Sequence, residues 1–563
     1  MQVYYLFDPE RKAMLNAAGK DYTPAYIPEI LSMLGVTAQP IGPQALIEGV
    51  LKASDILLTG SEALPRGMRA SCVHIAFASE GELTAFGLEG PGIRPQTDDP
   101  YRIDGYYEFE LAGRQLPLPV LGGFAAVKPQ EAEICGYAQV DGQKLAAFFS
   151  WGDTYYFAFD LPGIIWYAGD GRPLTEGKHG FALGRVPDGR VVPLSYDTRI
   201  AFSDYYAYML QTILARYGVP MIHRLPPVAE GQTADLLIYF AGDDDAYSAE
   251  NNIKAAEAMK ARGLPYHINV MPKNREGEFV LDREQQEALM RGGCEIAIHF
   301  DFTADLKSRF PYSEAGYRMQ AEMFERTFGR KTYTAVNHCL IQKGSCADRL
   351  RYEQQLGIRG NNDKIGEVDE SDVNAFNMWG YAFGTSFPRF TLDDAAHDNA
   401  HLDIVEIPST YYEPRLHGDN PQELAKLHNY LDCCVFWGRT GGLFFHPHYI
   451  SGVVVPAEPA LAALDACMAY CEEKGYQAVK TAPDALTRWW HERAASRILE
   501  VTPEGFILES AAEALSLRLP EGAGVVYVDS VRVDVERKAL EGTVCKLLTV
   551  KGRGRHTVRY EKA

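Results

Sequence analysis

Four short apolar runs in the middle of the chain are each followed closely by aspartate or histidine. The residues after these runs are Asp243-Asp244-Asp245, His299 with Asp301, Asn337-His338, and His446 with His448. One aspartate and two histidines with open coordination positions suit Zn²⁺ or a similar ion, which acidifies a bound water molecule. A further carboxylate can act as base, and a histidine can protonate a departing amine. We therefore expect a divalent metal centre that hydrolyses an amide.

Each of these pieces also has an ordinary structural explanation. An aspartate triplet in front of a helix can cap the helix and complement its dipole, and a lone histidine in a loop is usually a hydrogen-bonded structural residue. All four pieces, however, fall at the ends of predicted strands. Their coincidence favours a functional site over four separate structural accidents.

A repeated strand and helix pattern must position these side chains. The strand predicted at 236–240 is followed by a helix that Ser248 caps and that Gly263 and Pro265 end before the next strand. Asp282 and Gln285 have the spacing of a capping box for a second helix. Parallel strands joined by helices place their carboxyl ends together, where loops carry the chemistry.

Three strings in this region resemble motifs of the polysaccharide deacetylases, NodB-like carbohydrate esterases that remove N-acetyl groups from sugars. Tyr239–Ser248 resembles the first motif, Gly293–His299 the second, and Gly441–His446 the late strand that ends in the catalytic histidine. The motifs stand in the family's order. The resemblance implies an incomplete (β/α) barrel over residues 233–495.

The resemblance also implies roles for individual residues. It assigns the general base to Asp244, the general acid to His446, and the metal ligands to Asp245, His299 and His338, with Zn²⁺ as the expected ion.

The chain departs from the family pattern at two places. The usual second histidine ligand would fall at Thr303, so His338 is taken from the end of the next strand, as in divergent members. Asp243 stays an alternative to Asp244 as the base. The partner that orients the base, and the oxyanion contact, stay unassigned.

The remaining segments carry other patterns. Residues 1–115 alternate strands and helices and resemble the flavodoxin-like, glutamine-amidotransferase-like domains attached to some carbohydrate enzymes. Residues 116–190 hold short aromatic runs predicted as hairpin strands, including 164–167. Residues 191–232 are expected to form a connecting helix and linker, and 496–563 a small β-sandwich.

The amino-acid composition limits the classes of molecule that the protein is expected to bind. The 563 residues include 55 Lys and Arg against 75 Asp and Glu, a net charge of -20, without a basic block that would collect phosphates. This argues against nucleic acid, anionic membranes and very acidic polysaccharides and leaves neutral or amino sugars open. Carbohydrate is the partner that the resemblance implies. The first residues lack a signal-peptide pattern, and no apolar run reaches the roughly 18 residues of a membrane span. A cytoplasmic protein is expected.

Two functions compete. The first is a hydrolase that removes N-acetyl groups from an amino-sugar polysaccharide or oligosaccharide, and retention of the carboxylates and histidines favours it. The second is a non-catalytic carbohydrate-binding protein that keeps the barrel, favoured by loss of the usual second histidine. We take the hydrolase as the prediction, with another amide hydrolase of this barrel type as a third alternative.

Overall fold

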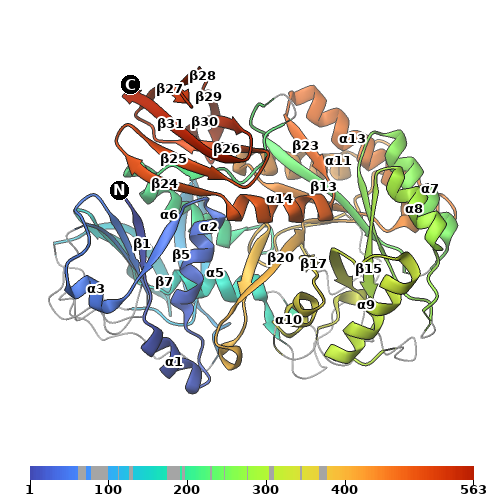
Figure 1. Cartoon of the computed structure of the whole chain (residues 1–563), viewed down its shortest axis with the longest axis horizontal. Coiled ribbons are helices and arrows are strands. Elements are labelled where there is room, and N and C mark those ends of the chain that lie inside the picture. Colours follow the sequence, from blue (N-terminus) through green and yellow to red (C-terminus); the bar gives the residue numbers. More distant parts are fainter. Residues whose placement is uncertain are drawn as a thin grey trace.

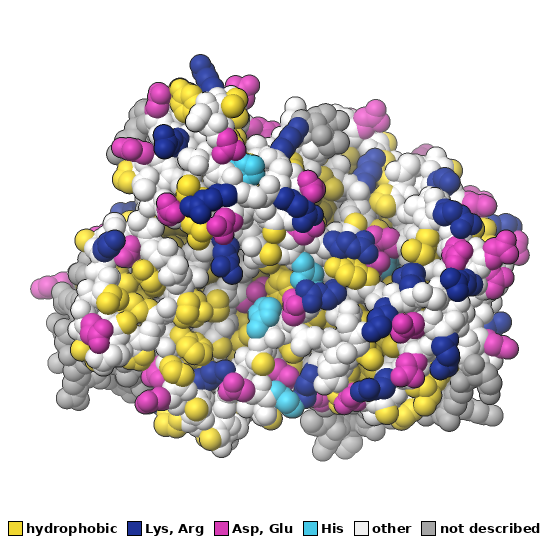
Figure 2. Space-filling model, in the orientation of Figure 1, with side chains coloured by type: hydrophobic (Ala, Val, Ile, Leu, Met, Phe, Trp, Pro, Cys, Tyr) yellow, Lys and Arg dark blue, Asp and Glu magenta, His cyan; other side chains and the backbone are white. Residues whose placement is uncertain are grey.

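The computed structural model describes residues 1–60, 72–77, 99–111, 113–125, 131–173, 191–192, 197–228, 231–245, 247–274, 277–302, 310–342, 345, 347–366 and 377–562. Three units pack together: an N-terminal α/β sheet, a central α/β sheet that curls into a half-barrel, and a C-terminal pair of β-sheets (Figure 1). Basic and acidic side chains are interspersed over the face shown in Figure 2. Within the described ranges, no helix is both long enough and apolar enough to cross a membrane.

One nine-stranded sheet forms the N-terminal unit, in the order β2-β1-β3-β4-β9-β8-β7-β5-β6. The strands are β1 Val3–Leu6, β2 Ala38–Ile41, β3 Ile56–Thr59, β4 Val73–Phe77, β5 Ile103–Leu111, β6 Arg114–Leu121, β7 Glu133–Val140, β8 Gln143–Trp151 and β9 Thr154–Phe157. The expected boundary at 115/116 falls inside β6. The described strands on both sides of this boundary therefore share one sheet and one hydrophobic core.

Helices of this unit are α1 Pro9–Ala17, α2 Ile27–Met33, α3 Pro43–Ile47, α5 Leu161–Asp170 and α6 Phe202–Arg216. The run 164–167, predicted as a strand, lies instead in α5, so that prediction is wrong. Asp160 caps this helix by accepting from the Gly163 N–H at 3.2 Å, and nearly every residue of the helix is buried. A helix that is apolar all round lacks the polar period that distinguishes it from a buried strand.

The central sheet runs in the order β18-β21-β22-β13-β14-β15-β16-β17-β20-β19, and β23 also pairs with β13. Its strands are β13 Leu236–Asp243, β14 Tyr266–Val270, β15 Cys294–Phe300, β16 Thr334–Asn337, β17 Gly360–Ile365, β18 Met378–Trp379, β19 Arg389–Leu392, β20 His401–Ser409, β21 Tyr411–Tyr412, β22 Thr440–Phe444 and β23 Ala478–Thr481. Pairing is parallel from β21 through β20. The strand ends that carry Asp and His therefore meet at one edge.

Helices connect these strands. They are α7 Ala249–Ala261, α8 Arg283–Arg291, α9 Glu314–Phe328, α10 Asp348–Gln355, α11 Pro421–Trp437, α12 Pro447–Ile450, α13 Glu458–Lys474 and α14 Pro483–Ala495. Ser248 caps α7, and the capping box of Asp282 and Gln285 opens α8.

The C-terminal unit consists of two antiparallel sheets, ordered β12-β26-β30-β29 and β24-β25-β31-β27-β28. Its strands are β12 Met221–Ile222, β24 Arg497–Thr502, β25 Gly505–Ser510, β26 Ala514–Leu519, β27 Ala523–Val528, β28 Val531–Val533, β29 Glu536–Leu540, β30 Thr543–Lys551 and β31 Gly554–Lys562. Strand β12 comes from the segment expected to be a linker, so this unit also uses residues that precede the barrel. Helix α14 runs between these sheets and the barrel (Figure 1).

Candidate metal centre

The edge of the central sheet brings Asp245, His299 and His338 together. One potential ligand atom from each lies within 4.8 Å of the other two. Asp245 Oδ1 is 3.5 Å from His299 Nε2 and 3.8 Å from His338 Nε2. Asp245 follows β13, His299 lies in β15 and His338 follows β16, so the three side chains come from separate strand ends. These are the residues that the family resemblance assigned to the metal.

The Nδ1 atom of each imidazole contacts an oxygen atom of the surrounding protein. His299 Nδ1 lies 3.2 Å from the carbonyl oxygen of Val336, and His338 Nδ1 lies 3.4 Å from Asp301 Oδ1. A partner on one ring nitrogen fixes the tautomer and presents the other nitrogen to a metal. Both Nε2 atoms therefore face Asp245.

These residues fit a divalent metal. In the part of the chain that the structure describes, Asp245 Oδ1 and His299 Nε2 are buried atoms without a hydrogen-bond partner. Leaving a buried polar atom unpaired costs about 1–3 kcal/mol, and a cation between them would remove this cost. One carboxylate and two imidazoles with positions left for water match the ligand set of a catalytic zinc site.

Neighbouring groups of opposite charge shift the pKa values of the candidate ligands. Burial would raise the pKa of Asp245, but the three surrounding histidines lower that pKa well below its ordinary range. Burial would likewise lower the pKa values of His299 and His338, yet neighbouring carboxylates raise both. Protons and a metal ion therefore compete for the same imidazole nitrogens.

His446 faces the triad from the end of β22. Its Nε2 lies 3.5 Å from Asp245 Oδ2, and its Nδ1 lies 2.6 Å from Glu413 Oε1. The backbone N–H of His446 also donates to Glu413 Oε1, at 2.9 Å. Burial would lower the pKa of His446, but Asp245 and Glu413 together raise it to about 9. The two carboxylates therefore favour the protonated form of His446.

Glu413 is a site residue that the sequence analysis missed. It follows the two-residue strand β21, which pairs in parallel with β22, so it occupies the same kind of strand end as the other site residues. A strand as short as Tyr411–Tyr412 gives no periodic signal. The sequence Tyr-Tyr-Glu-Pro at 411–414 is the signal that could have indicated Glu413 as a site residue.

Within the aspartate triplet, Asp243 and Asp244 have different neighbours. Asp244 Oδ1 accepts from the Met271 N–H at 2.9 Å, and its Oδ2 accepts from Asn252 Nδ2 at 3.3 Å. Asp243 Oδ2 instead lies 3.5 Å from His299 Nε2. Asp243 is the last residue of β13 and Asp244 follows the strand, and their two carboxylates contact different groups. The carboxylate beside the metal ligands is that of Asp243, which favours the alternative that the sequence analysis left open, while the choice of base stays a prediction.

The side chain that orients this carboxylate is an amide. Asn269 Nδ2 donates to Asp243 Oδ1 at 2.9 Å, and Asn269 Oδ1 lies 3.0 Å from His267 Nε2. His267 Nδ1 lies 3.0 Å from Glu295 Oε2. Burial would lower the pKa of His267, but Glu295 and Asp484 raise it, and the contact of His267 Nε2 with Asn269 Oδ1 orients the amide. This relay fills the position that the sequence left unassigned.

Gly242 explains how β13 and β22 come so close. A Cβ atom at this position would lie 1.7 Å from the carbonyl oxygen of Phe445, which no side chain can occupy. The close approach is what places the triplet beside His446. The glycine in the Gly-Asp-Asp-Asp string is thus required by packing.

Aromatic rings lie next to His446, whose ring centroid is 5.4 Å from that of His448 and 6.0 Å from that of Tyr449. Tyr247 is 53% exposed, and its ring lies 4.5 Å from that of His448. The His448 ring lies 3.9 Å from Tyr449, and the guanidinium of Arg415 lies 4.3 Å from the Tyr449 ring. Flat rings of this kind suit stacking against sugar rings.

Two other groups of potential ligands occur among the described residues. His267, Glu295 and Asp484 are joined by the hydrogen bonds of the relay and the start of α14. The group Asp393, Asp394 and His397 has Arg351 inserted into it, hydrogen-bonded to Asp393 at 2.9 Å. An inserted cation opposes a metal there. Thr303, the family's usual ligand position, lies outside the described residues.

No protein-family model and no curated protein matches the sequence. Several solved structures do match, and polysaccharide deacetylases recur among them. A proposed polysaccharide deacetylase from Mycobacterium smegmatis has a TM-score of 0.33 and 12% identity, covering 50% of this chain and 99% of that chain. The chitin deacetylase of the fungal pathogen Colletotrichum lindemuthianum has a TM-score of 0.25 and 12% identity, covering 46% and 88%.

A pseudoenzyme of the CE4 family from Bacillus anthracis is also similar, with a TM-score of 0.24 and 10% identity, covering 46% of this chain and 67% of that chain. At these TM-scores the likeness carries no argument about activity. The function has to be argued from the residues of this chain.

Proposed function

We propose that the chain is a divalent-metal-dependent hydrolase that removes N-acetyl groups from an amino-sugar polysaccharide or oligosaccharide. The observation that carries the proposal is the convergence of Asp245, His299 and His338, with buried atoms left unpaired between them. A candidate base and a candidate acid stand beside this triad. Zn²⁺ is the first ion to test, because the ligand types suit it.

A bound divalent ion would supply Lewis acidity, which activates water and polarises an amide carbonyl at neutral pH. In our proposal Asp243 takes a proton from the attacking water, and Asn269 holds its carboxylate in place. His446 gives a proton to the departing nitrogen. Glu413 keeps that imidazole oriented and protonated until the C–N bond breaks.

The sugar part of the proposal rests on the motif resemblance and on the exposed Tyr247 beside His448. The presence of a proton donor at the site supports an amide substrate, because an amine is a poor leaving group unless it is protonated. His446, with a pKa raised to about 9, is suited to supply it.

The test begins with metal content, measured by elemental analysis of wild type, His338→Ala and His417→Ala. His417 is the control because it is a histidine on the surface, 55% exposed and paired with Glu423. We expect about one ion per chain in wild type and in His417→Ala, and loss of the ion in His338→Ala.

Acetate release from N-acetylglucosamine oligosaccharides is then measured with the same three proteins. Release that follows the metal content supports the proposal. A wild-type site that cannot be filled with Zn²⁺, Co²⁺ or Mn²⁺ would overturn it. Metal binding and oligosaccharide binding without acetate release would favour the non-catalytic carbohydrate-binding protein.

A further inference from the structure

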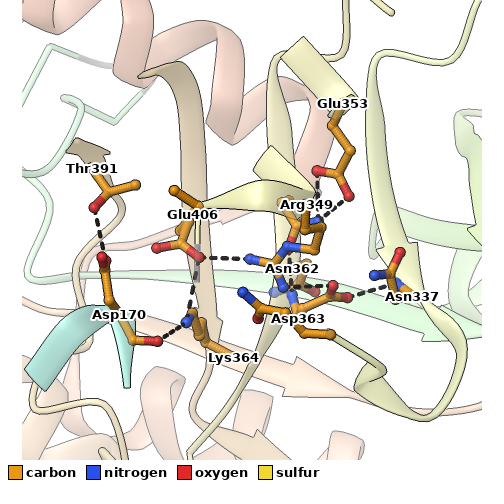
Figure 3. Close-up of polar contacts among 12 residues, drawn as sticks. Asp170, Asn337, Arg349, Glu353, Asn362, Asp363, Lys364, Thr391 and Glu406 are labelled. Atoms are coloured by element: carbon orange, nitrogen blue, oxygen red, sulfur yellow. Dashed lines mark hydrogen bonds and ion pairs between the residues drawn. The ribbon is translucent and has the colours of Figure 1, made fainter. Parts of the chain in front are cut away.

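A continuous row of buried charged side chains joins the N-terminal unit to the metal-ligand loop. Figure 3 shows Asp170 at one end, Asn337 at the other, and Glu406, Arg349 and Asp363 between them. Arg389 completes the row between Asp170 and Glu406. All of these side chains are buried.

The first half of the row crosses from one unit to the other. Asp170, the last residue of α5, accepts through Oδ1 from Arg389 Nη2 at 2.6 Å. The same nitrogen of Arg389, in β19 of the barrel, donates to Glu406 Oε2 at 2.7 Å. Lys364 strengthens the crossing, because its Nζ donates to the Asp170 carbonyl at 2.6 Å and lies 3.6 Å from Glu406 Oε1.

The second half runs through the barrel to the metal site. Glu406 Oε1 accepts from Arg349 Nη2 at 2.8 Å, and Arg349 Nη1 donates to Asp363 Oδ2 at 2.7 Å. Asp363 Oδ1 then accepts the backbone N–H of Asn337 at 2.7 Å. Asn337 directly precedes the ligand His338.

The loop that carries His338 needs such an anchor. Cys339 and Leu340 have φ values of 56° and 55°, a left-handed conformation that residues other than glycine adopt only when the surroundings enforce it. Asn337 is fixed on both sides, because its backbone N–H binds Asp363 and its side-chain amide donates to the Tyr317 hydroxyl at 2.6 Å. The position of His338 therefore depends on where Asp363 is held.

Asp363 is held in place by Arg349, which is itself one member of a row of alternating carboxylates and cations. Carboxylates and cations follow one another, so each is neutralised only by its neighbours, and in a buried row no water replaces a lost partner. A change at Asp170 leaves Glu406 as the carboxylate paired with Arg389, whose Nη1 also donates to the Tyr26 hydroxyl at 3.1 Å, and the charge imbalance extends toward Arg349. Packed charge networks of this kind settle into discrete arrangements and do not absorb a lost partner locally.

We infer that this row positions His338 as a metal ligand, which makes the N-terminal unit a working part of the metal centre. The inference rests on the proposed function, because it assigns His338 to the metal. Asp170, Arg389, Glu406, Arg349 and Asp363 act through Asn337 and are positioning residues. If the row merely held the two units together, its loss would lower stability and leave metal affinity and geometry unchanged.

The experiment uses the full chain with Co²⁺ as the probe. Co²⁺ affinity is measured by competition with a chelator, and the visible absorption spectrum reports the ligand geometry. Asp170→Asn is compared with Asp160→Asn. Asp160 lies at the start of the same helix α5, where it binds Thr23 Oγ1 at 2.6 Å and takes no part in the row.

We expect Asp170→Asn to weaken Co²⁺ binding about threefold or more and to shift the spectrum, since changes behind metal ligands commonly cost about 10- to 100-fold when they are adjacent. Asp160→Asn should keep both wild-type values even if its melting temperature falls. If Asp170→Asn does not fold, Arg389→Lys, which keeps the charge and loses the forked contact, takes its place with the same expectation.

If Asp170→Asn, or Arg389→Lys in its place, binds Co²⁺ with the wild-type affinity and has the wild-type spectrum, this inference is overturned and the proposed function stands. Equal weakening in Asp160→Asn would also overturn it, because the effect would then follow general destabilisation. A wild-type chain that binds no metal would overturn both the inference and the proposed function.

Discussion

The Nδ1 atom of His446 lies 2.6 Å from Oε1 of Glu413, and the same carboxylate oxygen accepts the backbone N–H of His446. This double contact fixes the position of the imidazole and favours its protonated form. The opposite nitrogen of the ring is left facing the metal ligands.

Replacing Glu413 with Gln is expected to lower kcat about 10- to 100-fold with little change in KM. Glu413 acts on the proton donor His446 and does not contribute to substrate binding. Loss of the carboxylate also lowers the pKa of His446, so the high-pH limb of the pH profile should move to lower pH. The profile of acetate release measures both effects. Glu423→Gln, which removes the carboxylate from the exposed pair with His417, is the control and should change neither. An unaltered profile in Glu413→Gln would remove His446 from the role of acid.

The aspartate triplet offers a matched pair of variants. Asp243→Asn should lower kcat about 10²- to 10⁴-fold while the protein keeps its metal, because it removes the base. Asp244→Asn should mainly lower the free energy of unfolding, by about 1–2 kcal/mol, because its carboxylate binds Met271 and Asn252. Acetate release and urea unfolding distinguish the two. The reverse pattern would restore the base to Asp244.

Asn269 orients the carboxylate of Asp243 and is itself oriented by His267. Asn269→Ala should lower kcat about 10-fold or more, because small displacements of a catalytic group are costly. His267→Gln should lower it less, since Asn269 keeps its bond to Asp243. Metal content, measured alongside, should stay at the wild-type level in both. A loss of metal in Asn269→Ala would show that the residue supports the metal ligands instead.

Glu406 makes stability depend on pH. Burial would raise the pKa of Glu406, but Lys364 and two buried arginines lower it from the ordinary 4.5 to about 2. A lowered carboxyl pKa gives stability that is present above about pH 4.5 and is lost as pH falls toward 2. At pH 7 Glu406→Gln should therefore be less stable than wild type, on the order of 3 kcal/mol.

Urea unfolding of both proteins between pH 7 and 3 measures this difference, which should shrink steadily below about pH 4.5. Glu513→Gln is the control, because that side chain is 79% exposed, and its difference from wild type should stay near zero throughout. A constant gap between Glu406→Gln and wild type would contradict the assignment of the ionised carboxylate to the row.

Local patterns were sufficient for much of the barrel. Ser248, and Asp282 with Gln285, cap the helices as predicted, because capping depends on residues within a few positions of each other. The aspartates and histidines after the apolar runs lie at strand ends, as their order in the chain indicated. That they bind a metal stays a prediction.

Other features depended on contacts between distant residues. The choice between Asp243 and Asp244 depends on which carboxylate meets Met271 and which meets His299, and the sequence shows only three adjacent aspartates. The two-residue strand before Glu413 exists because it pairs with β22. Helix α5 is buried on nearly all sides, so its sequence has no polar period to reveal it.

The sequence by itself determined the α/β pattern of the central unit and the residue types gathered at its strand ends, because periodicity and capping are local properties. Only the tertiary structure decided which carboxylate faces the triad, which residue holds His446, and how the N-terminal sheet extends past residue 115. It also joined Asp170 to Asn337 through buried charges. Side chains separated by tens or hundreds of residues meet only when strands pair and units pack, and no pattern within one segment encodes such a meeting.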